Sequence, residues 1–310
     1  MSSPATRIFV TGASGFVGRA VTARLLAEGH AVRALVRPGS LRPLNATPGL
    51  ETAAGDVSDA ASLLPAARGC QAAVHLVGII RERGPATFQA VHVEGTRHVL
   101  DACREAGVGR LIYLSALGAG RGTGTPYFRT KEAAEELVRA SGLDWTILRP
   151  SVIHGPQGDF MVQMARLVAR PGPVPLVGRG DQTVQPVWVE DVARSVAACL
   201  ARGSTVGRTI DVAGPDALTL RRFYTTLARV VLGREKSAVP VPTFLVRAGA
   251  WAAGAMLANP PVTPDELRML LAARPCDIRP MIDALGFRPA GFEETLMRYA
   301  PQLRTAAGLG

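Results

Sequence analysis

A glycine-rich stretch near residue 12 constrains the possible folds more than any other feature of the sequence. The apolar run Arg7–Thr11 is followed by the letters GASGFVG and then by an amphipathic segment over 16–27. This order predicts a strand, a tight turn at Gly12 and a helix. Gly15 would let the backbone approach a pyrophosphate, Gly18 would let the helix pack closely on the sheet, and the helix N-terminus favours an anion. The spacing is Gly-x-x-Gly-x-x-Gly, and its placement predicts a dinucleotide-binding loop.

Strand and helix patterns alternate through the first half of the chain. The strand patterns are apolar on both faces, as in buried parallel strands, and cover Arg7–Thr11, Ala31–Val36, Ala72–Val77, Arg110–Ser115 and Asp144–Arg149. The helical patterns cover Phe16–Ala27, Ser58–Ala67, Phe88–Ala106 and Tyr127–Ala140. We expect Ser58 to cap the second helix and Gly107 to end the third. This alternation of strands and helices predicts an α/β fold with a Rossmann-type, doubly wound parallel sheet.

The regular alternation of strand and helix patterns changes after Pro150, where Pro and Gly become frequent. A strand at Gln185–Val189, a helix at Asp191–Ala201 and a strand at Thr209–Val212 are expected to rejoin the main sheet. The chain after residue 217 is mostly helical in pattern. The sequence therefore predicts a nucleotide-binding domain over 1–150 plus 186–214, and a smaller, mostly helical C-terminal lobe over 151–185 plus 215–310.

The composition excludes several classes of protein. Hydrophobic residues make up 47% of the chain and charged residues 19%, which is too apolar for a disordered chain. The net charge is +10, but the basic residues are scattered without aromatic interleaving, so no nucleic-acid partner is expected. The irregular cysteine spacing fits a reducing compartment such as the cytoplasm. We find no secretory signal pattern and no apolar stretch of membrane-spanning length in the sequence.

The end of the second strand bears on the choice between NAD and NADP. An acid there would favour the free 2′-hydroxyl of NAD, whereas an Arg accommodates the 2′-phosphate of NADP. This strand ends at Val36-Arg37, with Arg33 upstream and no acid. The sequence therefore favours NADP(H), with NAD(H) as the alternative. Asp56 and Val57 follow the third strand, and we expect them at the adenine edge, with helix capping as an alternative role for Asp56.

These motifs resemble the short-chain dehydrogenase/reductase superfamily in its extended and atypical branches. TGASGFVG, GDV, HLVG, YFRTK, LRPSVIHGP and VWVEDVA stand in the family's order, over nearly the whole chain. The C-terminal NPPVTPDELRMLLAARPCD and LGFRPAGFEETL are similar to the group that contains the nucleotide-binding accessory subunit of respiratory complex I. The resemblance implies cofactor contacts from Gly12, Ser14, Gly15, Phe16, Val17, Gly18, Arg37, Asp56, Val57, Val77, Gly78, Lys131, Pro150 and Val152.

Tyr127 and Lys131 match the catalytic Tyr-x-x-x-Lys of that superfamily. The resemblance implies that Tyr127 is the general acid/base and that Lys131 lowers its pKa and holds the nicotinamide ribose; i and i+4 share one helix face. A Ser or Thr orients the substrate carbonyl in catalytic members. Ser115 matches the first of two adjacent hydroxyl positions, but Ala116 occupies the second, which carries the role in the family. The trio of Tyr127, Lys131 and Ser115 is therefore incomplete.

Three histidines lie near the predicted site. His92 stands where the family commonly has Asn, and we expect it to have a local structural partner rather than to relay protons. His75 and His154 are placed at strand ends, without further residues at metal-ligand spacing. No metal is therefore expected.

Two functions remain open from the sequence. The first is an atypical family member whose cofactor is structural or a sensor, serving a respiratory or quinone-linked complex. The second is an NADP-dependent reductase, dehydrogenase or nucleotide-sugar-type epimerase acting on a small apolar or sugar-derived substrate, in which Ser115 or Thr125 supplies the missing hydroxyl. Ala116 is the feature that separates the two.

The apolar segment Thr243–Ala258 is bounded by Pro242 and Pro260 and predicts a single helix. It is too short to cross a bilayer. We expect a core helix of the small lobe. The alternative is an exposed apolar face that docks on a partner subunit or a membrane, with the protein peripheral on the inner face of the cytoplasmic membrane. Phe244 and Trp251 would then be accessible to solvent.

Overall fold

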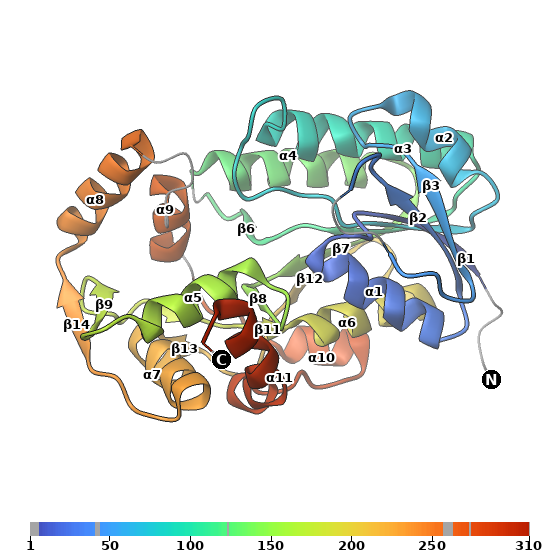
Figure 1. Ribbon diagram of the computed structural model, residues 1–310. Coiled ribbons are helices and arrows are strands. Elements are labelled where there is room, and N and C mark those ends of the chain that lie inside the picture. Colours follow the sequence, from blue (N-terminus) through green and yellow to red (C-terminus); the bar gives the residue numbers. More distant parts are fainter. Residues whose placement is uncertain (1–5, 41–43, 123, 257–262, 273, 310) are drawn as a thin grey trace. The chain divides into compact units, whose positions relative to one another are not determined.

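Figure 1 shows the computed structural model, which describes residues 6–40, 44–122, 124–256, 263–272 and 274–309. The chain divides into two units. The first contains Met1–Pro150, Val189–Val212 and Arg279–Phe287. The second contains Ser151–Trp188, Ala213–Ile278 and Arg288–Gly310.

The first unit is built on a seven-stranded sheet in the order β12-β7-β5-β4-β1-β2-β3, and every neighbouring pair is parallel. The chain leaves β1 toward β2 on one side and later returns to pair β4 on the other. The loop after β1 therefore lies at the switch point, where such sheets bind ligands. The strands are β1 Arg7–Thr11, β2 Ala31–Val36, β3 Leu50–Ala54, β4 Ala72–His75, β5 Arg110–Leu114, β7 Asp144–Pro150 and β12 Arg208–Val212.

Helices cover both faces of this sheet (Figure 1). One layer packs α2 (Ala60–Ala67) on α3 (Gly95–Glu105) and α3 on α4 (Pro126–Arg139). The other packs α1 (Phe16–Ala27) on α6 (Val189–Ala201), which also contacts α10 (Arg279–Leu285). The connections include the short strand β6 (Leu117–Gly120) and the single turn η2 (Gly203–Thr205). This arrangement confirms the doubly wound α/β sheet.

Four details of the first unit differ from the sequence analysis. The strand expected to end at Val77 ends at His75, and the helix expected over Phe88–Ala106 begins as a π-helical segment, η1 (Gln89–Glu94). Asp59, not Ser58, caps α2, because its carboxylate accepts from the Ala61 N–H at 3.2 Å. Residues 279–287, expected in the small lobe, belong to the first unit, where α10 packs against β12 and α6.

The second unit joins short two-stranded ladders to a helical core. β11 (Val187–Trp188) pairs with β8 (Ile153–His154) and does not rejoin the main sheet as expected. β14 (Ala238–Val241) pairs with β9 (Val174–Val177), and β10 (Thr183–Val184) with β13 (Leu218–Thr219). Phe223 and Phe292 stack in the core with ring centroids 5.0 Å apart. The helices are α5 Asp159–Ala169, α7 Leu220–Leu232, α8 Thr243–Met256, α9 Pro264–Ala272 and α11 Phe292–Ala307.

Helix α8 is not the core helix that the sequence analysis favoured. Phe244 is 68% exposed and Trp251 is 72% exposed. Residues 257 and 258 of the expected segment lie outside the described residues. Among the residues that the structure describes, no helix is long and apolar enough to span a membrane.

Candidate functional site

The glycine loop after β1 is held tightly against the start of α1. Gly12 has a φ of +76°, and its carbonyl accepts from the Gly15 N–H at 3.0 Å. A Cβ placed on Gly18 would stand 2.0 Å from the Gly12 carbonyl oxygen and 2.6 Å from the Cα of Ala13. No other residue fits at position 18 without moving this backbone. Both features follow from the glycines that the sequence places in this turn.

The first turn of α1 offers backbone N–H groups to an anion. Gly15 is the N-cap, and it makes no side-chain capping bond. The first N–H groups of a helix have no partner within the helix, and here they belong to Phe16, Val17 and Gly18. The Ser14 carbonyl points elsewhere and accepts from Arg19 Nε at 3.3 Å. A turn that ends at Gly15 and leads into backbone N–H groups without an intrahelical partner fits a pyrophosphate.

Arg37 and Asp56 lie together at the ends of β2 and β3. Arg37 Nε is 3.9 Å from Asp56 Oδ2, and the Arg37 side chain is 75% exposed. The other carboxylate oxygen of Asp56 accepts from the N–H and the hydroxyl of Ser58, at 2.8 and 2.7 Å. Arg33 is engaged differently, with Glu51 at 3.0 Å and the Arg68 carbonyl at 2.6 Å. Arg37 is therefore the cation at the end of β2 that could meet a ribose phosphate.

Val57 and Gly78 shape the loops around this edge of the sheet. Val57 is buried, and a Cβ on Gly95 would approach its Cγ2 to 3.0 Å, so the glycine lets η1 and α3 pack against it. A Cβ on Gly78 would stand 3.1 Å from Lys131 Nζ. Val77, the residue before Gly78, packs against the core of the first unit. The loop after β4 thus passes directly beside Lys131.

Lys131 is a buried ammonium on α4, only 3% exposed. It donates to the Leu114 carbonyl at 3.0 Å and to the Tyr113 hydroxyl at 3.4 Å. Burial lowers the pKa of Lys131 to about 8, and the charge of Glu135 acts in the opposite direction. An ammonium has three N–H groups, and only two are used by the described residues. The third is available to a ribose hydroxyl.

Tyr127 stands one helical turn before Lys131, among aromatic rings. Its ring is 5.5 Å from His92 and 5.9 Å from Phe88, both edge-on. Burial raises the pKa of Tyr127 to about 12. This is the opposite of the lowering that the family resemblance implied. Desolvation of the phenolate causes this rise, and Lys131 donates its hydrogen bonds to Leu114 and Tyr113 instead of to Tyr127.

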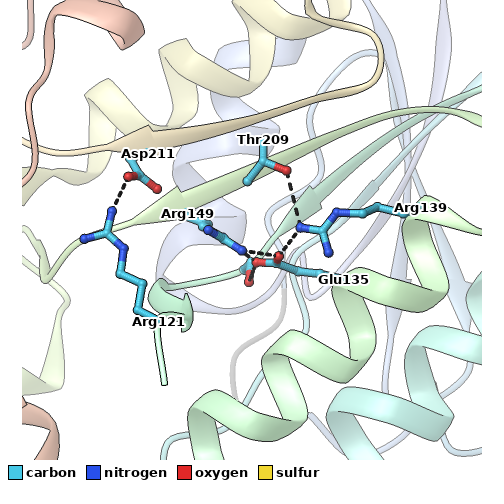
Figure 2. Close-up of polar contacts among 7 residues, drawn as sticks. Arg121, Glu135, Arg139, Arg149, Thr209 and Asp211 are labelled. Atoms are coloured by element: carbon cyan, nitrogen blue, oxygen red, sulfur yellow. Dashed lines mark hydrogen bonds and ion pairs between the residues drawn. The ribbon is translucent and has the colours of Figure 1, made fainter. Parts of the chain in front are cut away.

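Ser115 belongs to a buried ionic cluster instead of standing free beside Tyr127. Its hydroxyl donates to Glu135 Oε1 at 2.6 Å. Figure 2 shows the same carboxylate held by Arg149, through Nε at 2.7 Å and Nη2 at 2.6 Å, and by Arg139 at 2.5 Å. Glu135 has no exposed side-chain surface. The hydroxyl of Ser115 is therefore occupied, and its catalytic role stays a prediction.

The histidines have structural partners. His75 lies between the hydroxyls of Thr11 and Thr96, at 2.6 and 3.1 Å. His92 contacts Thr130 through Nδ1 at 2.9 Å and the Ile79 backbone through Nε2. In the second unit, His154 contacts the Tyr299 hydroxyl at 3.0 Å. Thr125, the alternative source of a hydroxyl, caps α4 by accepting from the Phe128 N–H at 3.3 Å.

The last two predicted cofactor residues fall on different units. Pro150 ends β7 and is buried in the first unit. Val152 belongs to the second unit, where its carbonyl accepts from the Val187 N–H at 2.9 Å. Val152 stays a prediction. Sequence reasoning missed Tyr113 and Glu135, although Glu135 follows Lys131 by four residues, as Lys131 follows Tyr127.

Comparison with known proteins decides the family. A family model described as NAD(P)H-binding matches residues 12–202, which is more than half of the chain. The chain belongs to the NAD(P)H-binding family. The match begins at Gly12 and includes the glycine loop, Arg37, Lys131 and the strands between them. This NAD(P)H-binding protein therefore binds a nicotinamide dinucleotide, and its fold is of the extended short-chain dehydrogenase/reductase type.

Its curated relatives carry different names. An uncharacterised protein of Mycobacterium tuberculosis is 30% identical over 98% of this chain, which spans 31% of that protein. The 2-alkyl-3-oxoalkanoate reductase of Stenotrophomonas maltophilia is 29% identical over 94% of this chain and 98% of its own. The mitochondrial NADH dehydrogenase [ubiquinone] 1 alpha subcomplex subunit 9 of Arabidopsis thaliana is 30% identical over 68% of this chain and 54% of its own.

The chain thus spans about a third of the length of the mycobacterial relative and about half of the subunit 9 protein. Two solved structures share its fold. That of gox2253 has a TM-score of 0.78 and 28% identity, covering 98% of this chain and 100% of its own. That of DesIV, a dTDP-glucose 4,6-dehydratase from Streptomyces venezuelae with NAD bound, has a TM-score of 0.74 and 25% identity, covering 97% and 98%.

Proposed function

We propose that this NAD(P)H-binding protein holds NADP(H) as a structural or sensing group. The observation that carries the proposal is the state of Ser115. Its hydroxyl donates to the buried carboxylate of Glu135, and Ala116 follows where the family has its substrate-orienting hydroxyl. Ser115 then directs its hydroxyl proton to Glu135 and offers none to a substrate carbonyl beside Tyr127. A bound nicotinamide can supply a hydride, but a site of this kind retains the reduced form.

The preference for NADP(H) over NAD(H) rests on Arg37. This side chain is exposed at the end of β2, and its nearest carboxylate, Asp56, is already bound by Ser58. A guanidinium in this position suits a 2′-phosphate, which it can bind with charge-assisted hydrogen bonds.

Mass spectrometry of nucleotide released from the purified protein tests this function. We expect NADP(H), in about one equivalent per chain, and no oxidation of the reduced form during incubation with a panel of aliphatic, aromatic and sugar-derived carbonyl compounds. Rapid oxidation of NADPH by any member of the panel would contradict a structural or sensing role. Release of NAD(H) alone would contradict the preference for NADP(H).

Arg37→Ala tests the preference within the site. Loss of one charge-assisted contact should weaken NADPH binding by roughly tenfold to a hundredfold, equivalent to about 1.5–3 kcal/mol, and should barely change NADH binding. Arg33→Ala is the matched control, because Arg33 lies on the same strand but is engaged by Glu51 and Arg68. Equal losses of both cofactors in Arg37→Ala would place this residue outside the phosphate site.

A second candidate function is an NADP-dependent reductase, dehydrogenase or epimerase. It is supported by Tyr127 and Lys131 on one face of α4 and by the reductase of Stenotrophomonas maltophilia, which aligns with 94% of the chain. In this case the substrate would be a small apolar or sugar-derived compound, and Thr125 or Ser115 would supply the hydroxyl. Turnover of a panel member that is lost in Tyr127→Phe, with cofactor binding retained, would favour this function.

We also propose a respiratory partner for the whole protein and a position on the inner face of the cytoplasmic membrane. The subunit 9 relative supports the first part, because its name assigns it to an NADH dehydrogenase subcomplex. Native mass determination of the tagged protein from a mild detergent extract should find it in a large complex with quinone-reducing activity. Recovery of monomer alone would contradict this part.

A further inference from the structure

We propose that one face of helix α8 docks on the surface of an anionic lipid bilayer. This inference goes beyond the dinucleotide site and specifies the residues behind the membrane position proposed above, on which it rests. The face is defined by Phe244, Arg247, Ala248 and Trp251, all of which are exposed. We call these four residues the α8 face.

The spacing of these residues makes one continuous surface. Positions three, four and seven apart lie on one side of an α-helix, so Phe244 and Trp251 flank Arg247 and Ala248 along the helix axis. Two large rings exposed by 68% and 72% are unusual on a protein surface, and exposed apolar patches mark interaction sites. Figure 1 shows α8 following β14 directly, and Val239 of that strand is also exposed.

The length and charge of α8 indicate a helix that lies in the plane of the membrane interface. Its 14 residues span about 21 Å at 1.5 Å per residue, which is shorter than a helix that crosses the hydrocarbon core. It contains no Asp or Glu, and Arg247 is its one charged residue. Interfacial helices contain both Trp, Phe or Leu and Arg or Lys, and aromatic rings are favoured at headgroup depth, where a long Arg side chain can also reach the headgroups.

Charge complementarity identifies the lipid surface as anionic. Arg247 is exposed, so its guanidinium can reach a lipid phosphate, and no ion pair or hydrogen bond joins it to the described residues. Lys236, which precedes β14, donates to the carbonyls of Arg170 and Gly172, and it forms no ion pair with a carboxylate among the residues that the structure describes. The whole chain has a net charge of +10. Long-range attraction to a negative surface follows from that charge.

A protein partner fits the same face less well. Protein interfaces carry about one hydrogen bond per 100–200 Å² and a polar rim. From Thr243 to Trp251, only the side chains of Thr243, Arg247 and Trp251 can form hydrogen bonds. A lipid interface requires no hydrogen bonds from the apolar part of the α8 face.

Co-sedimentation with vesicles tests the proposal. We expect the full chain to bind phosphatidylcholine vesicles that contain phosphatidylglycerol, and to bind pure phosphatidylcholine vesicles much less. Added salt should weaken the binding, because screening reduces the attraction between exposed charges. Arg247→Gln should weaken binding to the anionic vesicles about fivefold. Trp251→Ser should weaken binding to the anionic vesicles by tenfold or more.

Met297→Ser is the matched control, since Met297 is 56% exposed in the same unit but lies on α11, outside the α8 face. It should bind as the wild type does. Tryptophan emission should shift to shorter wavelength on vesicle binding, and Trp251→Phe should lose this shift while keeping most of the affinity. NADPH affinity is measured in every variant and should not change, so a failed proposal here is distinguishable from a failed cofactor function.

Three results would overturn the proposal. One is an absence of binding to anionic vesicles at low salt. Another is binding that Trp251→Ser and Arg247→Gln leave unchanged. The third is a concentration-dependent dimer that Trp251→Ser dissociates, because the α8 face would then be covered by a second copy of the chain.

Discussion

Gly18 shows how a single residue fixes the geometry of the dinucleotide loop. The carbonyl of Gly12 lies where the Cβ of any other residue at position 18 would be. The conflict is with backbone atoms, which cannot move without reshaping the turn that is predicted to bind the pyrophosphate. The glycine is therefore needed for close packing of helix on strand, the role that the sequence alone predicts for it.

Gly18→Ala should consequently lose both stability and cofactor affinity. Overpacking of this kind costs about 1–3 kcal/mol in unfolding free energy, and displacement of the α1 N-terminus should weaken NADPH binding by more than tenfold. Urea unfolding and fluorescence titration measure the two effects. Gly109→Ala is the control: Gly109 has no neighbour within 4 Å of an added Cβ, and its φ is not positive. Equal stability and equal NADPH affinity in Gly18→Ala and Gly109→Ala would refute the steric argument.

Lys131 is a residue whose charge depends on folding. Burial lowers its pKa to about 8, whereas an unfolded chain keeps the ordinary value of about 10.4. Between these values the unfolded state binds a proton that the folded state has released. Stability rises with pH wherever the unfolded state binds more protons. The buried Lys131 therefore lowers the free energy of unfolding most at neutral pH, and this loss becomes smaller as the pH rises through this window.

Lys131→Met should remove this dependence. Plotted against pH, the difference in unfolding free energy between wild type and Lys131→Met should change in favour of the wild type by up to about 3 kcal/mol between about pH 8 and pH 10.4. Urea unfolding of the cofactor-free proteins measures it. Lys236→Met controls for removal of a lysine as such. A difference that is flat across this range would show that Lys131 is not desolvated in the folded protein.

At the scale of an element, helix α4 carries three chemical groups on one face. Tyr127, Lys131 and Glu135 follow one another at intervals of four residues. Burial alone would raise the pKa of Glu135, but hydrogen bonds from Arg149 and Ser115 and the charge of Arg149 outweigh it, and the pKa is lowered. Glu135 ties α4 to β7 through Arg149, next to the Arg121–Asp211 ion pair in Figure 2. The cluster thereby holds α4, which carries Lys131, against β7 of the sheet.

Glu135→Gln should destabilise the protein strongly, because it leaves two guanidinium groups without their carboxylate. Breaking a buried pair costs about 3–5 kcal/mol. NADPH affinity should fall as well, since Lys131 loses its fixed position. Glu136→Gln makes the same chemical change one residue later, on an exposed side chain, and should have little effect. Unfolding and titration experiments on the two variants give the comparison. A mild effect in Glu135→Gln would show that Arg149 and Arg139 find other partners.

The elements of the first unit could be predicted from the sequence where local signals agree with the final packing. β1, α1 and β2 have the bounds that the sequence predicts, because apolar periodicity and glycine placement act in the same direction. The π-helical start at Gln89–Glu94 could not be predicted, and the partners of His92 within it, Ile79 and Thr130, come from other parts of the chain. The sequence placed β11 in the main sheet, but β11 pairs with β8, because a short apolar run does not specify its partner strand.

The candidate site also divides into features that the sequence predicts and features that depend on tertiary contacts. The glycine loop, Arg37 and Tyr-x-x-x-Lys are readable because the chemistry lies in short motifs. The engagement of Ser115 by Glu135 depends on two elements 20 residues apart, which no local pattern reveals. The direction of the Tyr127 pKa shift was likewise set by burial, which a sequence does not state for an individual hydroxyl. Ala116 was the one local sign that the catalytic trio is incomplete.

At the scale of the whole molecule, buried histidines in both units make stability depend on acid. Burial lowers the pKa of His75, His92 and His154 to about 3, compared with about 6.5 in an unfolded chain. Between about pH 3 and pH 6.5 the unfolded state therefore binds more protons than the folded state. Stability rises with pH over this window and is lost as the pH falls through it. Each histidine contributes a slope of up to about 1.4 kcal/mol per pH unit.

His154→Gln should reduce the slope of stability against pH by up to about 1.4 kcal/mol per pH unit, because it removes one titrating group from the second unit. Urea unfolding at a series of pH values from about 4.5 to 7.5 measures the slope for each variant. Tyr299→Phe is the matched control: it removes the hydroxyl that contacts His154 at 3.0 Å but leaves the imidazole in place. It should lower stability at every pH and keep the wild-type slope. Parallel curves for wild type and His154→Gln would mean that the pKa of His154 is the same in the folded protein as in the unfolded chain, and that its burial does not exclude the charge.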